Sequence, residues 1–175
     1  MKVPSLERYL KAFGQKVVDD AKKSLKKQKG DTALGKSIKF KVVPTATGFD
    51  TKFYMDDYGT YLDEGVSGTK TKRSFIDAKG QTRKSSYSYT NKQPPSSIIE
   101  KWIKKKGIKG RNNKTGRFIT NKSLSFLIAR SIKIKGIKSL SFFQKPLGVE
   151  YRRLKKDLLE ILKLDIQNYI TTYTK

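Results

Sequence analysis

The chain has 175 residues and a net charge of +25, with 40 Lys and Arg against 15 Asp and Glu. It contains neither Cys nor His, which excludes disulfides, thiolate or imidazole metal sites and the commonest general base. The hydrophobic share is only 35%, so we expect a modest core or one shared with a partner. Since no apolar run approaches the ~20 residues of a membrane span, we also expect a soluble protein with no membrane partner.

The first predicted elements are a long amphipathic helix and a β-hairpin. Apolar residues recur every three or four positions from Leu6 to Leu25, which is the spacing of one helical face, and Gly30 follows as a stop signal. The apolar period then changes to two over residues 38–42 and again over residues 49–55. This pattern predicts two antiparallel strands with one face in water.

The middle of the chain is predicted to hold an arm and a short helix. Residues 58–65 fit either a helical turn or the end of the preceding strand. Residues 69–93 form a basic insertion, which we expect to be a hairpin arm or a loop. Ser97 and Glu100 have the spacing of a capping box, in which each side chain satisfies the other residue's backbone N–H, so a helix should open there and run to Gly107.

Two more helices are expected toward the C-terminus. Residues 107–120 are polar and basic and predict an exposed loop, and apolar spacing predicts a helix from Ser123 to about Lys135. A C-terminal helical extension follows over residues 148–175. We therefore expect a single α+β domain over residues 1–175, with a long N-terminal amphipathic helix, antiparallel β-hairpins forming a small sheet, two further core helices and a long C-terminal helix.

Residues 30–37 match the phosphate-binding P-loop pattern letter for letter. That mechanism needs a strand before the loop and a helix after it, whereas here a predicted helix leads in and a predicted strand leads out. We therefore interpret Gly30 as a helix cap and Gly35 as part of a turn, and we do not expect nucleotide hydrolysis.

The acids of residues 50–64 offer the main catalytic alternative. The four that could gather a divalent metal for phosphodiester cleavage are Asp56, Asp57, Asp63 and Glu64. The chain has no His to activate water, and neighbouring residues on a helical turn point apart. We favour an acidic contact surface and predict no catalytic residue, no metal site and no cofactor.

Positive charge is concentrated in one part of the sequence. Residues 66–149 hold 21 basic residues and two acids, whereas residues 50–64 hold five acids and one Lys. Such a stretch has the composition of a phosphate-contacting surface, and any nucleic-acid contact should be independent of sequence and sensitive to salt. The residues predicted to contact DNA or an acidic partner are Lys72, Arg73, Arg83, Lys84, Lys104, Lys105, Lys106, Lys109, Arg111, Lys114 and Arg117.

Aromatic residues occur beside these charges. Tyr87 and Tyr89 fall on one side of the predicted arm, where they could stack on bases or contact another subunit. Trp102 lies among lysines, and we expect it to fill core rather than to stack on a base.

Four short motifs follow one another along the chain. They are YGTYLDEGVSG over residues 58–68, PPSSIIEKWI over residues 94–103, LSFLIARSIKIKGI over residues 124–137 and FFQKP over residues 142–146. In this order they resemble neck and tail-completion proteins of tailed bacteriophages. The resemblance covers about half of the chain, and the basic insertion and the long C-terminal helix go beyond the family's pattern.

The resemblance implies an α+β subunit of a closed ring, six- or twelve-fold, between the portal or head and the tail, through whose bore the genome passes. It implies no enzyme activity, a place in the virion at the head–tail junction after assembly in the host cytoplasm, and the portal and other neck or tail proteins as partners. The alternative is an intracellular, sequence-independent nucleic-acid-binding protein, with or without metal-dependent nuclease activity.

A ring subunit presents unlike patches to its two neighbours, so an acidic segment on one edge could meet a basic arm on the other. The residues predicted at the subunit interface are Tyr58, Tyr61, Asp63, Glu64, Tyr87, Tyr89, Phe142 and Phe143. The Lys-rich surface should then face genomic DNA in the bore or the acidic surfaces of the portal.

Overall fold

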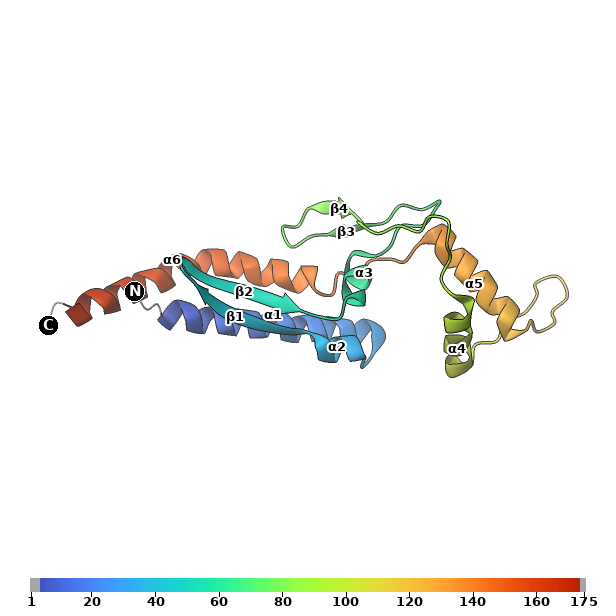
Figure 1. Ribbon diagram of the computed structural model, residues 1–175, viewed down its shortest axis with the longest axis horizontal. Helices are drawn as coiled ribbons and strands as arrows, with labels where there is room; N and C mark the ends of the chain where they lie inside the picture. The colour runs from blue at the N-terminus through green and yellow to red at the C-terminus, as the bar shows by residue number, and fades with distance from the viewer. Residues whose placement is uncertain (1–3, 174–175) are drawn as a thin grey trace. The chain divides into compact units, whose positions relative to one another are not determined.

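A computed structural model of the chain describes residues 4–173. The expected α+β class is confirmed, with a long N-terminal helix, two antiparallel two-stranded sheets, middle helices and a long C-terminal helix that packs on the first (Figure 1). The elements are α1 (Pro4–Lys29), α2 (Ala33–Ser37), β1 (Lys39–Thr45), β2 (Gly48–Tyr54), α3 (Tyr58–Glu64), β3 (Ser74–Ile76), β4 (Thr82–Lys84), α4 (Ser96–Lys106), α5 (Asn121–Lys135) and α6 (Gln144–Tyr173). Across residues 4–173, no helix has the length and apolar character that crossing a membrane requires.

Contacts within the chain divide it into two compact units. Unit 1 consists of Met1–Asp63, Ile76–Thr82 and Leu140–Lys175, and unit 2 consists of Glu64–Phe75 and Arg83–Ser139. The expected arm, residues 69–93, is divided between the units. The expected extension, residues 148–175, falls in unit 1, and its last two residues lie outside the described range.

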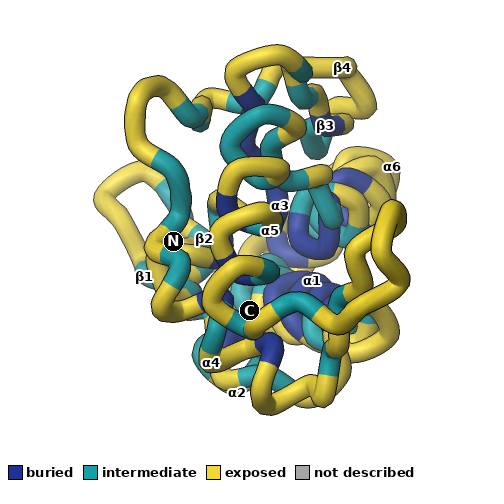
Figure 2. The backbone as a smooth tube through the Cα atoms, turned by 90° about the vertical axis from the view of Figure 1, so that its right-hand side faces the viewer, coloured by how far each residue is buried: buried dark blue, intermediate teal, exposed yellow. Residues whose placement is uncertain are grey.

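The predicted N-terminal helix is confirmed as α1 in unit 1. Val17, Ala21 and Leu25 are spaced four residues apart and are buried, and the buried stretches of α1 can be followed in Figure 2. The helix ends where the N–H of Gly30 donates to the carbonyl of Lys26, with Gly30 at a φ of +77°. A side chain is disfavoured in that conformation, which explains the glycine.

The first hairpin packs its apolar face against α1, as the period of two predicts. Phe40 of β1 lies directly opposite Phe53 of β2, and the intervening lysines remain exposed. The Phe53 ring lies edge-on to Phe13 of α1 at 6.3 Å and to Phe143 at 5.3 Å, between ring centroids. Each such pair contributes about 0.5–1.5 kcal/mol beyond the area that it buries. The hairpin is thereby fixed to the core of unit 1.

α6 begins four residues before the expected position. The buried carboxylate of Asp63, at the end of α3, accepts hydrogen bonds from the backbone N–H groups of Phe143 (2.8 Å) and Gln144 (3.3 Å). These N–H groups have no partner within the helix itself. Pro146 is tolerated because it lies in the first turn. The start of α6 is therefore set by a residue 80 positions earlier in the chain.

Unit 2 is built around the pair α4 and α5. Ile99 and Ile103 of α4 and Ala129 of α5 are buried against one another. The Thr120 hydroxyl accepts a hydrogen bond from the N–H of Ser123 at 3.2 Å, so α5 begins two residues earlier than expected. α4 ends at Gly107, which has a φ of +63°.

The capping box expected at the start of α4 does not form. The helix begins at Ser96 after Pro95, and no side chain caps it. Ser97 consequently lies inside the first turn rather than before it. The carboxylate of Glu100 turns instead to Lys104, one turn along the helix, at 3.0 Å.

Two glycines of unit 2 lie where backbone segments touch. Val66 and Ile137 form an antiparallel bridge. A Cβ added to Gly68 would lie 2.2 Å from the carbonyl oxygen of Ile134, and one added to Gly136 would lie 2.1 Å from the carbonyl oxygen of Val66. No side chain fits at either position, so these glycines have a structural role in unit 2.

Of the two forms expected for residues 69–93, a hairpin arm or a loop, the structure has a short hairpin. Its strands, β3 and β4, have three residues each. The carboxylate of Asp77 accepts hydrogen bonds from the N–H groups of Lys79 and Gln81, at 2.9 Å each, which holds the turn. For residues 58–65 the sequence allowed either a helical turn or the end of a strand, and the structure has the helix α3 there.

Candidate interaction surfaces

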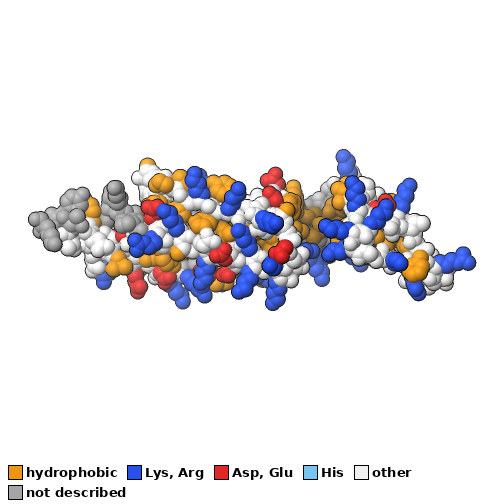
Figure 3. All heavy atoms as spheres, turned by 90° about the horizontal axis from the view of Figure 1, so that it is seen from below, with side chains coloured by type: hydrophobic (Ala, Val, Ile, Leu, Met, Phe, Trp, Pro, Cys, Tyr) orange, Lys and Arg blue, Asp and Glu red, His pale blue; other side chains and the backbone are white. Residues whose placement is uncertain are grey.

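Unit 2 holds most of the protein's excess positive charge. It contains 19 Lys and Arg and two acids, Glu64 and Glu100, a net charge of +17, whereas unit 1 contains 21 basic residues and 13 acids, a net charge of +8. All of the residues predicted to contact DNA or an acidic partner belong to unit 2. In Figure 3, Lys and Arg dominate the surface over α4 and α5, and most of the acids in view lie over other elements.

The segment between α4 and α5, residues 107–120, is exposed as expected but has internal order. We name it the basic finger. Arg111 and Phe118 form an antiparallel bridge, and the Asn112 N–H donates to the carbonyl of Arg117 at 2.9 Å. At the tip, the side-chain oxygen of Asn112 accepts from the N–H of Lys114 at 2.9 Å. An asparagine at the start of such a turn bonds its own backbone further on, which defines the loop's shape.

An exposed aromatic ring positions two of the finger's cations. Phe118 is 61% exposed. The guanidinium carbon of Arg111 lies 4.5 Å from the centre of this ring, and Nζ of Lys109 lies 5.9 Å from it. Both distances are within the range of cation–π attraction. Arg111 and Lys109 are therefore held on the outside of the finger with their charges in water.

Trp102 does not fill the core of unit 2, and the sequence-based expectation is wrong. It is 47% exposed and follows Ile98, which is 64% exposed, by one turn of α4. Ile99 and Ile103 already occupy the buried side of the helix. The pair Ile98 and Trp102 and the pair Ile99 and Ile103 thus lie on different faces of α4, and only the second pair packs against α5.

The outward face of α5 adds basic residues that sequence reasoning missed. Lys122, Phe126 and Arg130 follow one another at intervals of four and are exposed. These residues lie on the side of α5 opposite to the apolar residues Leu124 and Ile128. This helical periodicity is visible in the sequence and could have identified the face, whereas counting charges could not.

Several of the predicted contact residues have partners within unit 2. Nε of Arg73 donates to the carbonyl of Lys135 at 2.9 Å, and Lys104 pairs with Glu100. Lys105 and Lys106 lie at the end of α4 and are exposed. The remaining predicted contact residues are also exposed: Lys72, Arg83 and Lys84 near β3 and β4, and Lys114 and Arg117 in the finger.

In unit 1, acidic and aromatic side chains meet at the start of α3. Asp56 and Asp57 are exposed, and Tyr58 and Tyr61 are 45% and 44% exposed. The N–H of Asp56 donates to the hydroxyl of Ser37 at 3.0 Å, which holds the segment against the end of α2. We name these four residues, 56–58 and 61, the acidic edge.

Three residues predicted at the subunit interface are placed in the interior of unit 1 instead. Asp63, Phe142 and Phe143 are only 2%, 0% and 8% exposed. Asp63 caps α6, and the two phenylalanines belong to the core that contains α1. Side chains this deeply buried have almost no surface to offer a neighbouring subunit, so we remove them from the candidate interface.

The remaining interface candidates are half-buried in unit 2. The carboxylate oxygen Oε2 of Glu64 is buried and has no hydrogen-bond partner. Tyr87 and Tyr89 lie beyond β4, on a segment whose backbone bonds to both sides of Ser67. Burial raises the pKa of the Tyr89 hydroxyl. Tyr58 and Tyr61 are thus the more accessible aromatic pair.

The buried acids of unit 1 are used within the unit. α1 and α6 run antiparallel, and Asp165 of α6 accepts hydrogen bonds from the backbone N–H groups of Ser5 and Leu6, at 3.0 Å each. Burial raises the pKa of this carboxyl, but hydrogen bonds from the Ser5 side chain and the two N–H groups lower it by more, so the pKa lies below its usual value. Asp165 therefore serves as the N-terminal cap of α1.

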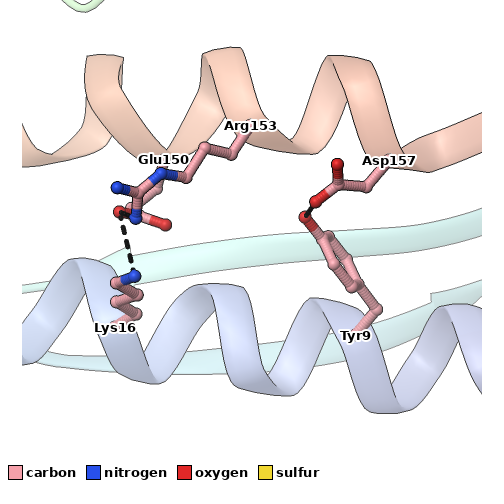
Figure 4. Close-up of polar contacts among 5 residues, drawn as sticks. All are labelled: Tyr9, Lys16, Glu150, Arg153 and Asp157. Atoms are coloured by element: carbon pink, nitrogen blue, oxygen red, sulfur yellow. Dashed lines mark hydrogen bonds and ion pairs between the residues drawn. The ribbon is translucent and has the colours of Figure 1, made fainter.

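Two further polar contacts join α1 and α6 (Figure 4). The Tyr9 hydroxyl donates to the Asp157 carboxylate at 2.7 Å, and the buried Glu150 pairs with Lys16 at 3.6 Å and Arg153 at 2.7 Å. Burial, the bond to Asp157 and the charges of Asp157 and Glu150 outweigh Arg153 and raise the pKa of Tyr9 to about 12.

The P-loop letters have the element order that the sequence indicated. α1 leads into Gly30, and after the five-residue α2 the chain enters β1. Gly35 lies within α2 rather than in a turn, and its N–H donates to the Thr32 hydroxyl at 3.2 Å. The Thr32 side chain is thus the cap of a short helix.

Over residues 4–173, no three acidic side chains lie close enough together to hold a metal ion. Asp63, one of the four acids considered for such a site, directs its carboxylate to the start of α6. Asp63 therefore has a helix-capping role, whereas Asp56 and Asp57 are exposed.

No protein-family model, no curated protein and no solved structure matches this chain. The resemblance to phage neck and tail-completion proteins therefore rests on the four sequence motifs alone.

Proposed function

We propose that the chain is a non-enzymatic structural subunit of a closed ring at the head–tail junction of a tailed bacteriophage. Its basic surface faces genomic DNA or the acidic surfaces of the portal and neighbouring proteins. The observation that carries this proposal is that one chain bears two unlike surfaces, the acidic edge in unit 1 and the +17 charge of unit 2.

Unlike surfaces on one chain favour head-to-tail association. When a patch on one copy contacts a different patch on the next, the assembly either closes into a ring or grows as a filament. Complementary charge fixes the register of such a contact and disfavours wrong partners. The exposed Tyr58 and Tyr61 supply the apolar and hydrogen-bonding area that a charged contact lacks.

The total charge links ring formation to a polyanion. Each subunit carries +25, so subunits repel one another unless their charge is screened or neutralised. At physiological salt, screening acts over about 8 Å, which leaves neighbouring subunits within each other's field. A DNA strand in the bore, or an acidic portal surface, would remove this penalty.

Native mass spectrometry of the purified chain, alone and with portal protein, tests the proposal. We expect oligomers of one fixed copy number that increase when portal is present, and we expect the double variant Tyr58→Ala/Tyr61→Ala to reduce them. Tyr151→Ala, which removes an aromatic side chain of similar exposure from α6, is the matched control. A chain that stays monomeric at every concentration and with portal contradicts the proposal.

The alternative, a sequence-independent nucleic-acid-binding protein, is favoured by the basic finger. It predicts that a monomer binds DNA and that particles assemble normally without the chain. If the chain is a nuclease, it should cleave DNA in the presence of metal, and Asp63→Asn should abolish the cleavage. If Asp63 only caps α6, the chain should show no cleavage, and Asp63→Asn should lower its stability. The mass measurement and a cleavage assay therefore separate the two functions.

A further inference from the structure

We infer that the basic finger and the outward face of α5 bind duplex DNA through its phosphate backbone, without reading its sequence. This inference rests on the proposed function, which leaves open whether the basic surface of unit 2 meets DNA or an acidic protein. It commits to DNA and assigns the contact to particular residues.

Positive charge is dense in the finger and its flanking helices. Residues 101–139 hold 13 basic residues and no acid. Within this stretch the finger contributes Lys109, Arg111, Lys114 and Arg117 over nine positions. Double-stranded DNA carries one negative charge per ~1.7 Å of its axis, so a closely spaced group of cations can meet several phosphates at once.

The basic finger is ordered by contacts within the chain itself. The Arg111–Phe118 bridge and the Asn112 turn hold its backbone, and the Ile119 N–H donates to the carbonyl of Gly110 at 3.0 Å at its base. The Phe118 ring holds the side chains of Arg111 and Lys109. Cations held in this way lose less conformational freedom on binding, which favours affinity.

The basic finger is continuous with the outward face of α5. Thr120 ends the finger and is also the cap of α5, so the basic face passes directly from the finger to Lys122 and Arg130. Phe126 lies between these two cations on the same face and is 51% exposed. α5 therefore extends the row of exposed cations beyond the finger.

The composition of the finger favours DNA over a protein partner. The core of a protein interface is depleted in charged residues, whereas the large apolar side chain that the finger exposes, Phe118, is occupied by cations. Phosphate contacts use Lys and Arg together with Asn, Thr and backbone N–H groups, which are the groups that residues 107–120 provide. Nothing in the finger has the spacing of a base-reading module, so we expect no sequence preference.

The test is equilibrium binding of the full chain to two labelled duplexes of unrelated sequence over a range of salt concentrations. The test variant carries Lys109→Gln, Arg111→Gln, Lys114→Gln and Arg117→Gln. The matched control carries Lys23→Gln, Lys27→Gln, Lys39→Gln and Lys41→Gln, which removes the same charge from exposed positions of unit 1.

We expect both duplexes to bind equally well. The finger variant should bind at least ~10-fold more weakly at low salt, and its slope of log K against log salt should be shallower by about 3 to 4, at ~0.9 per lost phosphate contact. The control variant should change much less. Equal losses in both variants, no binding of the unaltered chain at low salt, or a clear preference for one duplex would overturn the inference.

Two additional measurements keep the result unambiguous. Lys114→Gln/Arg117→Gln spares the Arg111–Phe118 contact and should keep about half of the slope change, and Arg111→Lys/Arg117→Lys keeps the charge and should bind nearly as the unaltered chain does. Polyglutamate should compete poorly, and competition equal to that of DNA at equal charge would assign the surface to acidic proteins and overturn the inference.

Sedimentation of the same samples separates this inference from the proposed function. Assembly that persists while the finger has no effect on DNA binding refutes the inference alone. Finger-dependent DNA binding by a chain that never associates refutes the ring and leaves the inference standing.

Discussion

Unit 1 and unit 2 differ in what stabilises them. Unit 1 has a buried cluster of nine apolar side chains, and its buried acids pair with groups of the same unit, as Glu150 does with Lys16 and Arg153. In unit 2, the corresponding buried cluster has three members, and the unit contains 19 basic residues but only two acids. A smaller core with a larger self-repulsion makes a unit that gains more from a bound polyanion. We therefore expect a bound polyanion to stabilise unit 2 more than unit 1.

The largest effect should follow from opening the core of unit 1. Phe142 is fully buried, so Phe142→Ala should lower the free energy of unfolding by about 3–5 kcal/mol. Denaturant titration measures this change. The control is Phe126→Ala, half-exposed in unit 2, which should cost much less. Similar losses in the two variants would contradict the placement of Phe142.

The next effect tests the backbone of unit 2. Gly136 and Gly116 have nearly the same φ, +71° and +68°, but only at Gly136 would a Cβ meet backbone. Substitution by Ala should cost about 1–2 kcal/mol at Gly116 from conformational strain, and about 1–3 kcal/mol at Gly136, where ψ is −171° and the backbone is in a region that essentially only glycine adopts. At Gly136 a displaced backbone should add about 1–3 kcal/mol. Thermal unfolding of the two variants measures the difference, and equal losses would be inconsistent with the close approach of Val66.

A polyanion should sharpen the contrast between the units. Inorganic polyphosphate at ~100 times its Kd should stabilise whatever binds it by about 2.7 kcal/mol. We expect hydrogen exchange to slow mainly in α4 and α5, because the unpaired positive charge is concentrated there, and less in α1 and α6. Mass spectrometry of peptides from each helix gives this comparison. Equal protection in all four helices would contradict the prediction that a polyanion binds unit 2 in preference to unit 1.

The smallest effect concerns the cap that α6 provides to α1. Since the pKa of Asp165 is lower in the folded protein than in the unfolded chain, its stabilising contribution is present above the unfolded value of ~4 and is lost as the pH falls through the lowered folded value. Both carboxylate oxygens of Asp165 accept from N–H groups, so Asp165→Asn places an NH2 group against one of these donors and should cost about 1 kcal/mol at neutral pH. It should also remove this part of the acid dependence. Urea unfolding near neutral and acid pH measures both changes.

The control for this pH effect is Asp31→Asn. Asp31 forms an exposed ion pair with Lys26, and such pairs contribute little. If Asp165→Asn left the acid dependence as it is in the unaltered chain, Asp165 would not be the cap that the distances indicate.

Local patterns predicted the elements that local residues determine. α1 follows from its apolar spacing and from Gly30, and the first hairpin follows from alternation over β1 and β2. The ends of α4 and α5 follow from Gly107 and Gly136. These signals work because helix periodicity, strand alternation and glycine's conformational freedom are properties of short segments.

The features that the sequence did not predict depend on residues far apart in the chain. The start of α6 depends on Asp63, and the burial of Phe142 and Phe143 depends on a core formed by α1. Trp102 was expected inside because it is large and apolar, but Ile99 and Ile103 occupy the face of α4 that meets α5. The excess positive charge of residues 66–149 could be counted from the sequence. The bridge between Arg111 and Phe118 and the contacts of Arg111 and Lys109 with the Phe118 ring could not, because they depend on how the finger folds.

We propose that this chain forms a ring around DNA at a head–tail junction, and electron cryomicroscopy of assembled phage particles would show such a ring. We expect a closed ring of this chain between portal and tail, with the basic finger toward the bore. Particles with a complete junction that lack the chain would contradict the claim.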